Sequence, residues 1–130
     1  MLEVQIFTLY PDLYPGLLDV GIYKKAKEKQ KWSLKIIDIR DYAFDDNRTV
    51  DDTPFGGGSG MLLKPDVVAS ALDKNIKTKE KIIYLSPKGK RLDQKEVKSL
   101  SKLNKINILC GHFEGVDQRL LETRNIEEYS

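Results

Sequence analysis

Apolar positions along the chain alternate between short runs of β-type residues and stripes with helical spacing. The apolar runs at 2–9 and 32–39 enclose a basic segment, 20–30, of helical composition, which predicts a strand, a helix and a second strand. After a long loop, Pro65 suits the first turn of another helix. The predicted buried stripe of that helix comprises Val67, Val68, Ala71 and Leu72.

The unbroken apolar run 82–85 is typical of a strand that is buried on both faces of a sheet. We expect a loop at 86–92 after it and then a helix that begins at Asp93, where Glu96 three residues later completes a capping-box pattern. The residues of this helix expected to face the sheet are Val97, Leu100 and Leu103.

The same unit of strand, short loop and helix follows a second time. The run 106–110 is a predicted strand, 111–115 a glycine loop and 116–124 a helix, before a last short strand at 126–129. Successive strands joined through helices are parallel, with right-handed crossovers. The fold class is therefore α/β, a parallel sheet with flanking helices.

Composition limits the class of protein. The 130 residues suit one domain, and no apolar run approaches the roughly 18 residues of a membrane span. The N-terminus leads straight into a strand and lacks the features of a secretory signal, so we expect a cytoplasmic protein with no membrane partner. One cysteine and one histidine provide neither a disulfide framework nor a zinc site, and no metal is expected.

The net charge is only +2, but lysines gather in two segments, 24–35 and 88–105. Solvated helix faces are the simpler interpretation of either cluster alone. The presence of two clusters modestly favours a polyanionic partner.

Two loops at strand ends are candidate ligand sites, because parallel sheets bind ligands at the carboxyl ends of their strands. The loops are 85–91, where Pro87 and Gly89 shape the turn, and 110–115, which contains two glycines, an aromatic residue and a carboxylate. Neither matches a dinucleotide or P-loop fingerprint. Cys110 and His112 are interpreted as a packing residue and a loop residue.

The segment 43–63 is longer than most structureless connections within a domain, which indicates a functional or disordered element. Its glycines allow backbone angles that other residues avoid, so the loop could fold closely around a ligand.

Three motifs occur in order along the chain, together with FTLYPDLY at 7–14: RTVDDTPFGGGSGM at 48–61, IIYLSPKGKRLDQ at 82–94 and ILCGHFEGVDQR at 108–119. With these motifs the sequence resembles the bacterial tRNA (guanine-N1)-methyltransferases, the TrmD-type members of the SPOUT superfamily. The resemblance implies a trefoil-knot fold, S-adenosylmethionine as cofactor, a homodimer, and methylation of N1 of guanosine 37, just 3′ of the tRNA anticodon.

The resemblance also implies roles for residues. The cofactor pocket is assigned to Tyr84, Leu85, Ser86, Pro87, Gly89, Gly111, Phe113 and Gly115. Catalytic or supporting roles are assigned to Glu114, Asp51 and Arg48. The entering nucleotide is expected beside Asp52, Gly56, Gly57 and Gly58. His112 and Phe113 stand where many relatives carry arginine and tyrosine.

Members of this family continue well past the position of residue 130. Their additional chain completes the knot, carries the aspartate regarded as the general base, and forms a C-terminal tRNA-binding domain. We therefore expect residues 1–130 to be the N-terminal portion of the SPOUT domain, truncated before the knot is complete and inactive alone.

Two other classes of function remain open from the residues themselves. One is a nucleotide- or flavin-binding α/β module without methyl transfer. The other is a non-catalytic RNA-binding or dimerisation module, for which the lysine clusters are the support.

Overall fold

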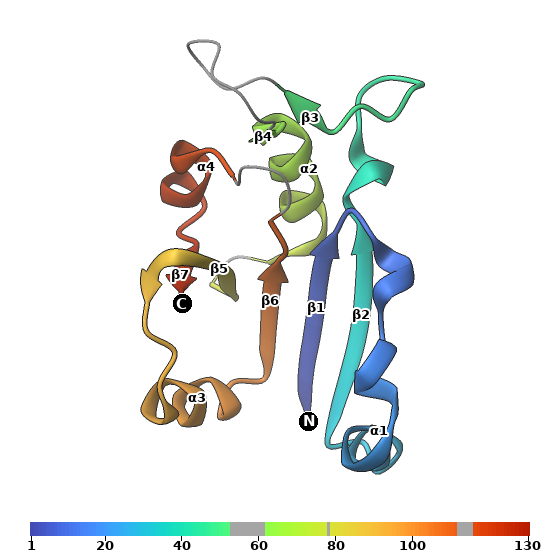
Figure 1. The fold of residues 1–130 in the computed structure, drawn as a ribbon, viewed down its shortest axis with the longest axis vertical. Helices are drawn as coiled ribbons and strands as arrows, with labels where there is room; N and C mark the ends of the chain where they lie inside the picture. Colours follow the sequence, from blue (N-terminus) through green and yellow to red (C-terminus); the bar gives the residue numbers. More distant parts are fainter. Residues whose placement is uncertain (53–61, 78, 112–115) are drawn as a thin grey trace.

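The computed structural model describes residues 1–52, 62–77, 79–111 and 116–130. Its centre is a wholly parallel five-stranded sheet in the order β2-β1-β6-β5-β7 (Figure 1). The strands are β1 (Leu2–Thr8), β2 (Trp32–Asp38), β5 (Lys81–Lys90), β6 (Lys105–Leu109) and β7 (Glu127–Tyr129). The predicted α/β class and the parallel sheet are confirmed.

Four helices accompany the sheet in the described part of the chain. They are α1 (Gly21–Glu28), α2 (Pro65–Asn75), α3 (Gln94–Ser101) and α4 (Gln118–Thr123). Short 3-10 turns lie at 11–13, 16–19 and 39–42. In Figure 1, α2 and α4 lie toward the carboxyl ends of the strands, and α1 and α3 lie toward the opposite edge. None of the helices in the described ranges is long and apolar enough to cross a bilayer.

The long connection after β2 is more ordered at its ends than the sequence indicated. Its described ends form β3 (Asp51–Asp52) and β4 (Leu62–Leu63), which pair antiparallel. The backbone of Val50 accepts a hydrogen bond from Lys64 N at 2.7 Å, and its side chain is buried. The ends of the connection are therefore held together beside the start of α2, while 53–61 lie outside the described residues.

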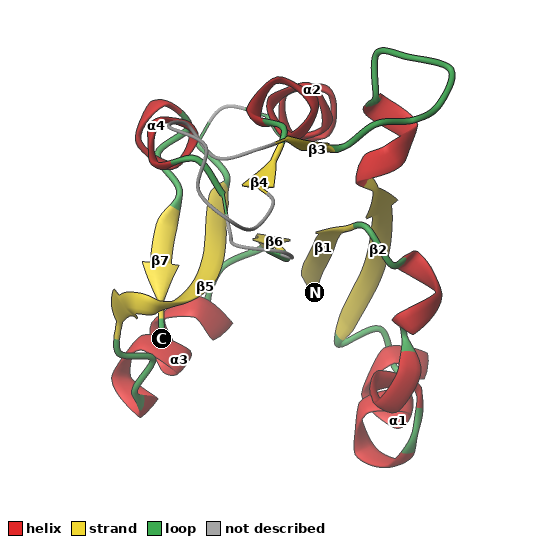
Figure 2. Ribbon diagram, turned by 45° about the horizontal axis from the view of Figure 1, so that its top comes forward, coloured by secondary structure: helices red, strands yellow, loops and turns green. Residues whose placement is uncertain are grey.

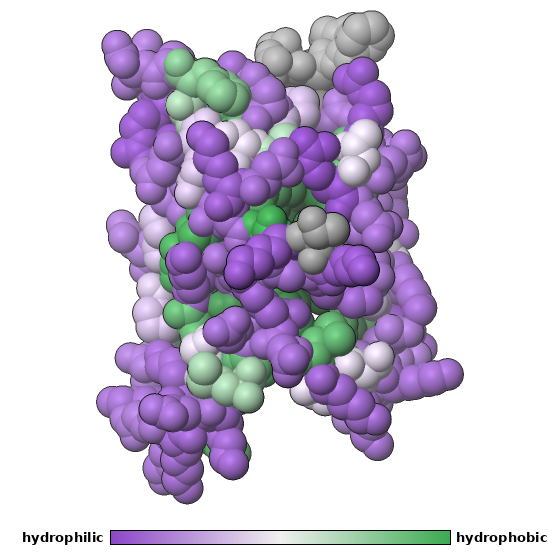
Figure 3. Space-filling view, turned by 180° about the vertical axis from the view of Figure 1, so that it is seen from behind, coloured by the Kyte–Doolittle hydropathy of each residue, from purple (hydrophilic) through white to green (hydrophobic). Residues whose placement is uncertain are grey.

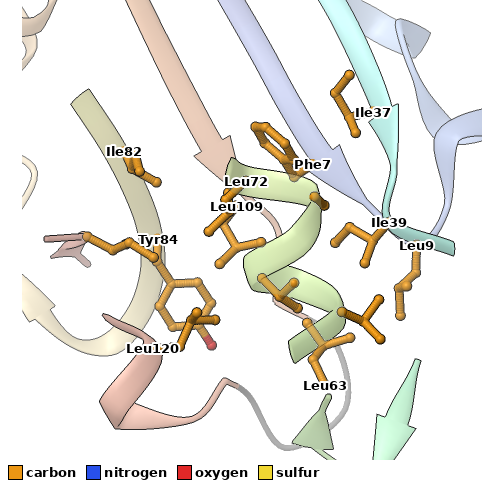
Figure 4. Packing of buried hydrophobic residues seen from close by; sticks show 14 of the residues in the cluster. Phe7, Leu9, Ile37, Ile39, Leu63, Leu72, Ile82, Tyr84, Leu109 and Leu120 are labelled. Atoms are coloured by element: carbon orange, nitrogen blue, oxygen red, sulfur yellow. The ribbon is translucent and has the colours of Figure 1, made fainter. Parts of the chain in front are cut away.

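The main core lies on the face of the sheet that α2 and α4 cover. Figure 4 shows Phe7, Leu72 and Leu109 meeting where α2 packs on the sheet. The predicted stripe of α2 is fully buried. The view from behind shows apolar residues sunk between hydrophilic side chains (Figure 3). This core fixes the carboxyl ends of β1, β6 and β5 relative to one another.

The other face of the sheet has a smaller core. Ile83, Ile106 and Tyr129 are buried there, and Leu100 of α3 and Leu103, just after the helix, pack against them. The prediction that Val97 also faces the sheet is wrong, because its side chain is 41% exposed. The helix α3 is short and meets the sheet only through its C-terminal half.

The prediction of a loop at 86–92 is also wrong over most of its length. The strand β5 continues to Lys90, with a shift in its pairing to β7 between Leu85 and Lys90. Two backbone hydrogen bonds hold this extension, Ser130 N to Lys90 O at 2.7 Å and Leu92 N to Ser130 O at 2.9 Å. Pairing with a strand 40 residues away therefore orders a segment with loop composition.

The connection between β1 and β2 carries apolar side chains that the described chain leaves uncovered. Figure 2 shows α1 far from α2 and α4, and none of its residues is buried. The exposed apolar residues of this connection are Tyr10, Leu13, Leu17, Val20, Ile22 and Tyr23.

Candidate functional site

The two segments predicted as ligand loops follow register partners in neighbouring strands. In the parallel pair of β5 and β6, Tyr84 lies opposite Leu109, so Leu85 and Cys110 begin the two segments side by side, although β5 itself continues to Lys90. The parallel, neighbouring arrangement of the two strands agrees with the prediction from the sequence. Within the second loop, 112–115 lie outside the described residues, so the predictions for His112, Phe113, Glu114 and Gly115 are not tested by the structure.

The aromatic ring of Tyr84 lies directly against the backbone of Gly111. A Cβ atom at Gly111 would stand 2.4 Å from Cε1 and 2.6 Å from the hydroxyl oxygen of Tyr84. Tyr84 is 8% exposed, and burial raises its pKa, with a further contribution from the charge of Glu128. Glycine at 111 therefore lets the end of β6 meet the ring of Tyr84.

A carboxylate that sequence reasoning missed also lies at this edge. Glu128 in β7 is the register partner of Tyr84, and its Oε2 accepts a hydrogen bond from Ser86 Oγ at 2.5 Å. No sequence signal could have found it, because its place depends on the sheet order that puts β7 next to β5. The edge thus combines a phenol, a hydroxyl and a carboxylate.

Gly89 packs against the backbone of β7. A Cβ atom there would lie 2.4 Å from the carbonyl carbon and 2.6 Å from the nitrogen of Tyr129. The close backbone approach at Gly89 is thus to β7. Leu85 and Pro87, two other predicted pocket residues, are exposed.

Arg48 follows β2 in the chain and lies beside Asp38, the last residue of that strand, and β1 and β6 separate β2 from β5. Its Nη2 lies 2.5 Å from Asp41 Oδ1 and 3.4 Å from Asp38 Oδ2, and its Nε donates to Arg40 O at 3.4 Å. The backbone of Arg48 has a positive φ of 56°. These contacts fix the direction in which the chain leaves toward β3.

The remaining predicted residues of this loop are only partly placed. Asp51 and Asp52 form β3, and Gly56, Gly57 and Gly58 lie outside the described residues. In the described residues the structure therefore brings Tyr84, Ser86 and Gly111 together and leaves Arg48 apart from them.

A crevice is expected between β1 and β6, because the chain leaves these neighbours in opposite directions, toward β2 and toward β7. Tyr14 and Cys110 meet there, with 3.4 Å between the hydroxyl oxygen and Sγ. This hydrogen bond, with burial and the charge of Cys110, raises the pKa of Tyr14 to about 12. Cys110 N also donates to Phe7 O at 2.9 Å.

One hollow on the described surface lies between α2 and α4, lined by Pro65, Asp117 and Arg124. Two others lie away from this edge. One follows the exposed side of α3, and another lies where β5, β6 and β7 begin, beside Lys81, Lys105 and Glu127. Within the described ranges, His, Cys, Asp and Glu form no group of three or more that could hold a metal ion. The candidate site therefore rests on the strand ends and on the residues around Tyr84.

Comparison with known proteins agrees with this arrangement. The family model described as tRNA (Guanine-1)-methyltransferase TrmD matches residues 2–130. The chain belongs to this TrmD family. It is 61% identical over 130 residues to the tRNA (guanine-N(1)-)-methyltransferase of Pelagibacter ubique, covering 100% of this chain and 57% of that protein. To the enzyme of the same name from Rhizobium johnstonii it is 48% identical over 129 residues, covering 98% and 53%.

A solved TrmD-type structure has the same fold. The tRNA (m1G37) methyltransferase from Aquifex aeolicus matches with a TM-score of 0.85 and 36% identity, over 97% of this chain and 58% of that one. The family and the SPOUT-type α/β fold expected from the resemblance are thus confirmed. The chain spans a little over half the length of these TrmD relatives.

Proposed function

We propose that this chain provides the cofactor side of an S-adenosylmethionine-dependent tRNA methyltransferase that acts on N1 of the guanosine 3′ of the anticodon. The observation that carries the proposal is the match of the TrmD family over 2–130, with Tyr84 and Gly111 packed together at the predicted edge. Methyl transfer from a sulfonium needs donor and acceptor aligned and a base for the N1 proton.

The residue roles in this proposal follow the resemblance. The wall of the pocket is formed by Tyr84, Leu85, Ser86, Pro87, Gly89, Gly111, Phe113 and Gly115. Glu114, Asp51 and Arg48 act near the target base, and Asp52 and the glycine loop close over it. Arg48 is already oriented by two carboxylates, which supports a fixed position for the start of this loop.

The proposed partners are tRNA and a second copy of the chain, and the proposed compartment is the cytoplasm. The apolar residues exposed between 10 and 23 support the dimer, because large uncovered apolar patches commonly mark interaction sites. The two lysine-rich segments, 24–35 and 88–105, support tRNA as a partner because it is a polyanion. The trefoil knot, the general-base aspartate and the tRNA-binding domain, which the resemblance places beyond residue 130, stay predictions.

The test compares the 130-residue chain with the product of its complete reading frame. Each is incubated with labelled adenosylmethionine and a tRNA transcript, and methylated guanosine is measured by mass spectrometry after digestion. We expect methylation by the complete product, none when the target guanosine is replaced by adenosine, and none by the 130-residue chain alone if the reading frame is longer.

Ligand binding separates this proposal from the other classes. Calorimetry is performed with adenosylmethionine, a flavin nucleotide and ATP. Binding of flavin or ATP without adenosylmethionine would favour a nucleotide-binding module. Binding of tRNA that weakens steeply with salt, with no cofactor bound, would favour a non-catalytic RNA-binding module.

A further inference from the structure

The side chains of Glu128, Tyr84 and Ser86 lie on one face of the sheet at the candidate site. Tyr84 and Glu128 are register partners in parallel β5 and β7, and side chains in register share a face. Ser86, two residues after Tyr84, donates its hydroxyl to Glu128 Oε2 at 2.5 Å. The hydrogen bond fixes the carboxylate beside the ring that covers Gly111.

The charge of Glu128 has no opposite charge paired with it among the described residues. The nearby lysines pair with other carboxylates: Lys81 Nζ lies 2.8 Å from Glu127 Oε1, and Lys90 Nζ lies 2.6 Å from Glu96 Oε1. Glu128 itself is half-buried, and the side chain that donates to it in the described part of the chain is the neutral hydroxyl of Ser86. Its electrostatic effect reaches the neighbouring ring, since it contributes to the raised pKa of Tyr84 after burial. An uncompensated negative charge therefore lies at the proposed cofactor wall.

The proposed methyl donor and its product differ in charge at one atom. Adenosylmethionine carries a positive sulfonium, and transfer of the methyl group leaves a neutral thioether in adenosylhomocysteine. We propose that Glu128 determines charge specificity at this site, so that its carboxylate favours the cationic donor over the neutral product. This inference rests on the proposed function, because it assumes that adenosylmethionine binds at this edge.

The expected size of the effect follows from Coulomb's law in a partly exposed site. With an effective dielectric constant between those of protein and water, and with screening by salt, one unit charge about 10 Å away changes an affinity about fivefold. The same attraction disappears when the sulfur becomes neutral, which speeds release of the product relative to the donor.

The test is calorimetric binding of both ligands to protein from the complete reading frame. Glu128→Gln removes the charge and keeps an acceptor for the hydroxyl of Ser86. Ser86→Ala removes the hydrogen bond and keeps the charge. Glu122→Gln makes the same change of charge at an exposed position of α4 and serves as the matched control. Thermal unfolding checks that each variant is folded.

We expect Glu128→Gln to lower the ratio of donor affinity to product affinity about fivefold. Most of this change should come from weaker binding of adenosylmethionine. Glu122→Gln should leave this ratio unchanged. Ser86→Ala should retain most of the preference for the donor, because Glu128 keeps its charge. In the wild type, high salt should reduce donor affinity more than product affinity, which tests the charge without any mutation.

Two results overturn the inference alone. One is equal weakening of both ligands in Glu128→Gln, which would mean that Glu128 acts only through packing. The other is an unchanged ratio in that variant, whatever the salt dependence of the wild type. If the wild type binds neither ligand, the proposed function fails and the inference fails with it.

Discussion

Replacing Gly89 with alanine tests whether this glycine serves the packing of β5 on β7. The added Cβ would stand 2.4 Å from the carbonyl carbon of Tyr129, whereas ordinary contacts begin at 3.4 Å. The φ of Gly89 lies outside the left-handed region, so alanine suffers from the contact and not from its own backbone angles. Because the opposing atoms belong to backbone, no side-chain rotation relieves the clash, and β5 and β7 must separate by about 1 Å.

The separation weakens the hydrogen bonds that anchor the end of the sheet. Ser130 N to Lys90 O, at 2.7 Å, and Leu92 N to Ser130 O, at 2.9 Å, would both lengthen beyond useful range. Each lost bond costs about 1 kcal/mol, and overpacking costs about 1–3 kcal/mol. We expect Gly89→Ala to lower the free energy of unfolding by about 3 kcal/mol, which corresponds to a fall of about 10 °C in Tm.

The assay is urea denaturation followed by the fluorescence of Trp32. Trp32 is the single tryptophan and begins β2, at the opposite side of the sheet from β7, so its signal reports unfolding of the whole sheet. Lys88→Ala, at an exposed neighbour, is the control and should stay within about 0.5 kcal/mol of the wild type. A Gly89→Ala protein with unchanged stability and weakened adenosylmethionine binding would refute the packing argument and leave ligand contact as the role of Gly89.

Two further predictions concern titration and buried polarity. The hydrogen bond with Cys110 raises the pKa of Tyr14 from its ordinary value of 10.0 to about 12, so its stabilising effect is complete below pH 10 and is lost as the pH rises toward 12. The stability difference between the wild type and Tyr14→Phe, measured in urea at pH 9 and 11, should therefore shrink at the higher pH; a constant difference contradicts this. Asn107 is fully buried, accepts from Gln5 Nε2 at 2.8 Å and donates to Lys81 O at 3.1 Å. Asn107→Ala should cost about 2 kcal/mol in the same assay, and a loss under 0.5 kcal/mol would contradict the network.

Features with a local cause were predictable from the sequence. The start of α2 at Pro65 and its buried stripe follow from proline geometry and helical spacing, and both are confirmed. The start of α3 is also confirmed, since Asp93 Oδ1 accepts from Glu96 N at 2.9 Å. The reciprocal half of the capping box is replaced, because the carboxylate of Glu96 pairs with Lys90 instead. The ammonium group of Lys90 thus takes the place of the backbone N–H of Asp93 as the partner of the Glu96 carboxylate.

Features with a distant cause were not predictable. The composition of 86–92 is typical of a loop, and no residue within it signals pairing with β7. The prediction that Val97 faces the sheet failed, because helical spacing alone does not determine the angle at which α3 meets the sheet. Glu128 became a candidate only when the sheet order placed β7 next to β5.

The sheet order also limits how the site residues can cooperate. Arg48 follows β2 and Glu128 lies within β7, so the two positions lie at opposite sides of the sheet. With strands about 4.8 Å apart, β2 and β5 alone are separated by about 14 Å, which is beyond the reach of direct side-chain contact. Under the proposed function, the part of β5 and β7 around Tyr84 and Glu128 therefore holds the methyl donor. Arg48, in the described part of the long connection, therefore lies apart from the proposed donor and cannot contact it directly.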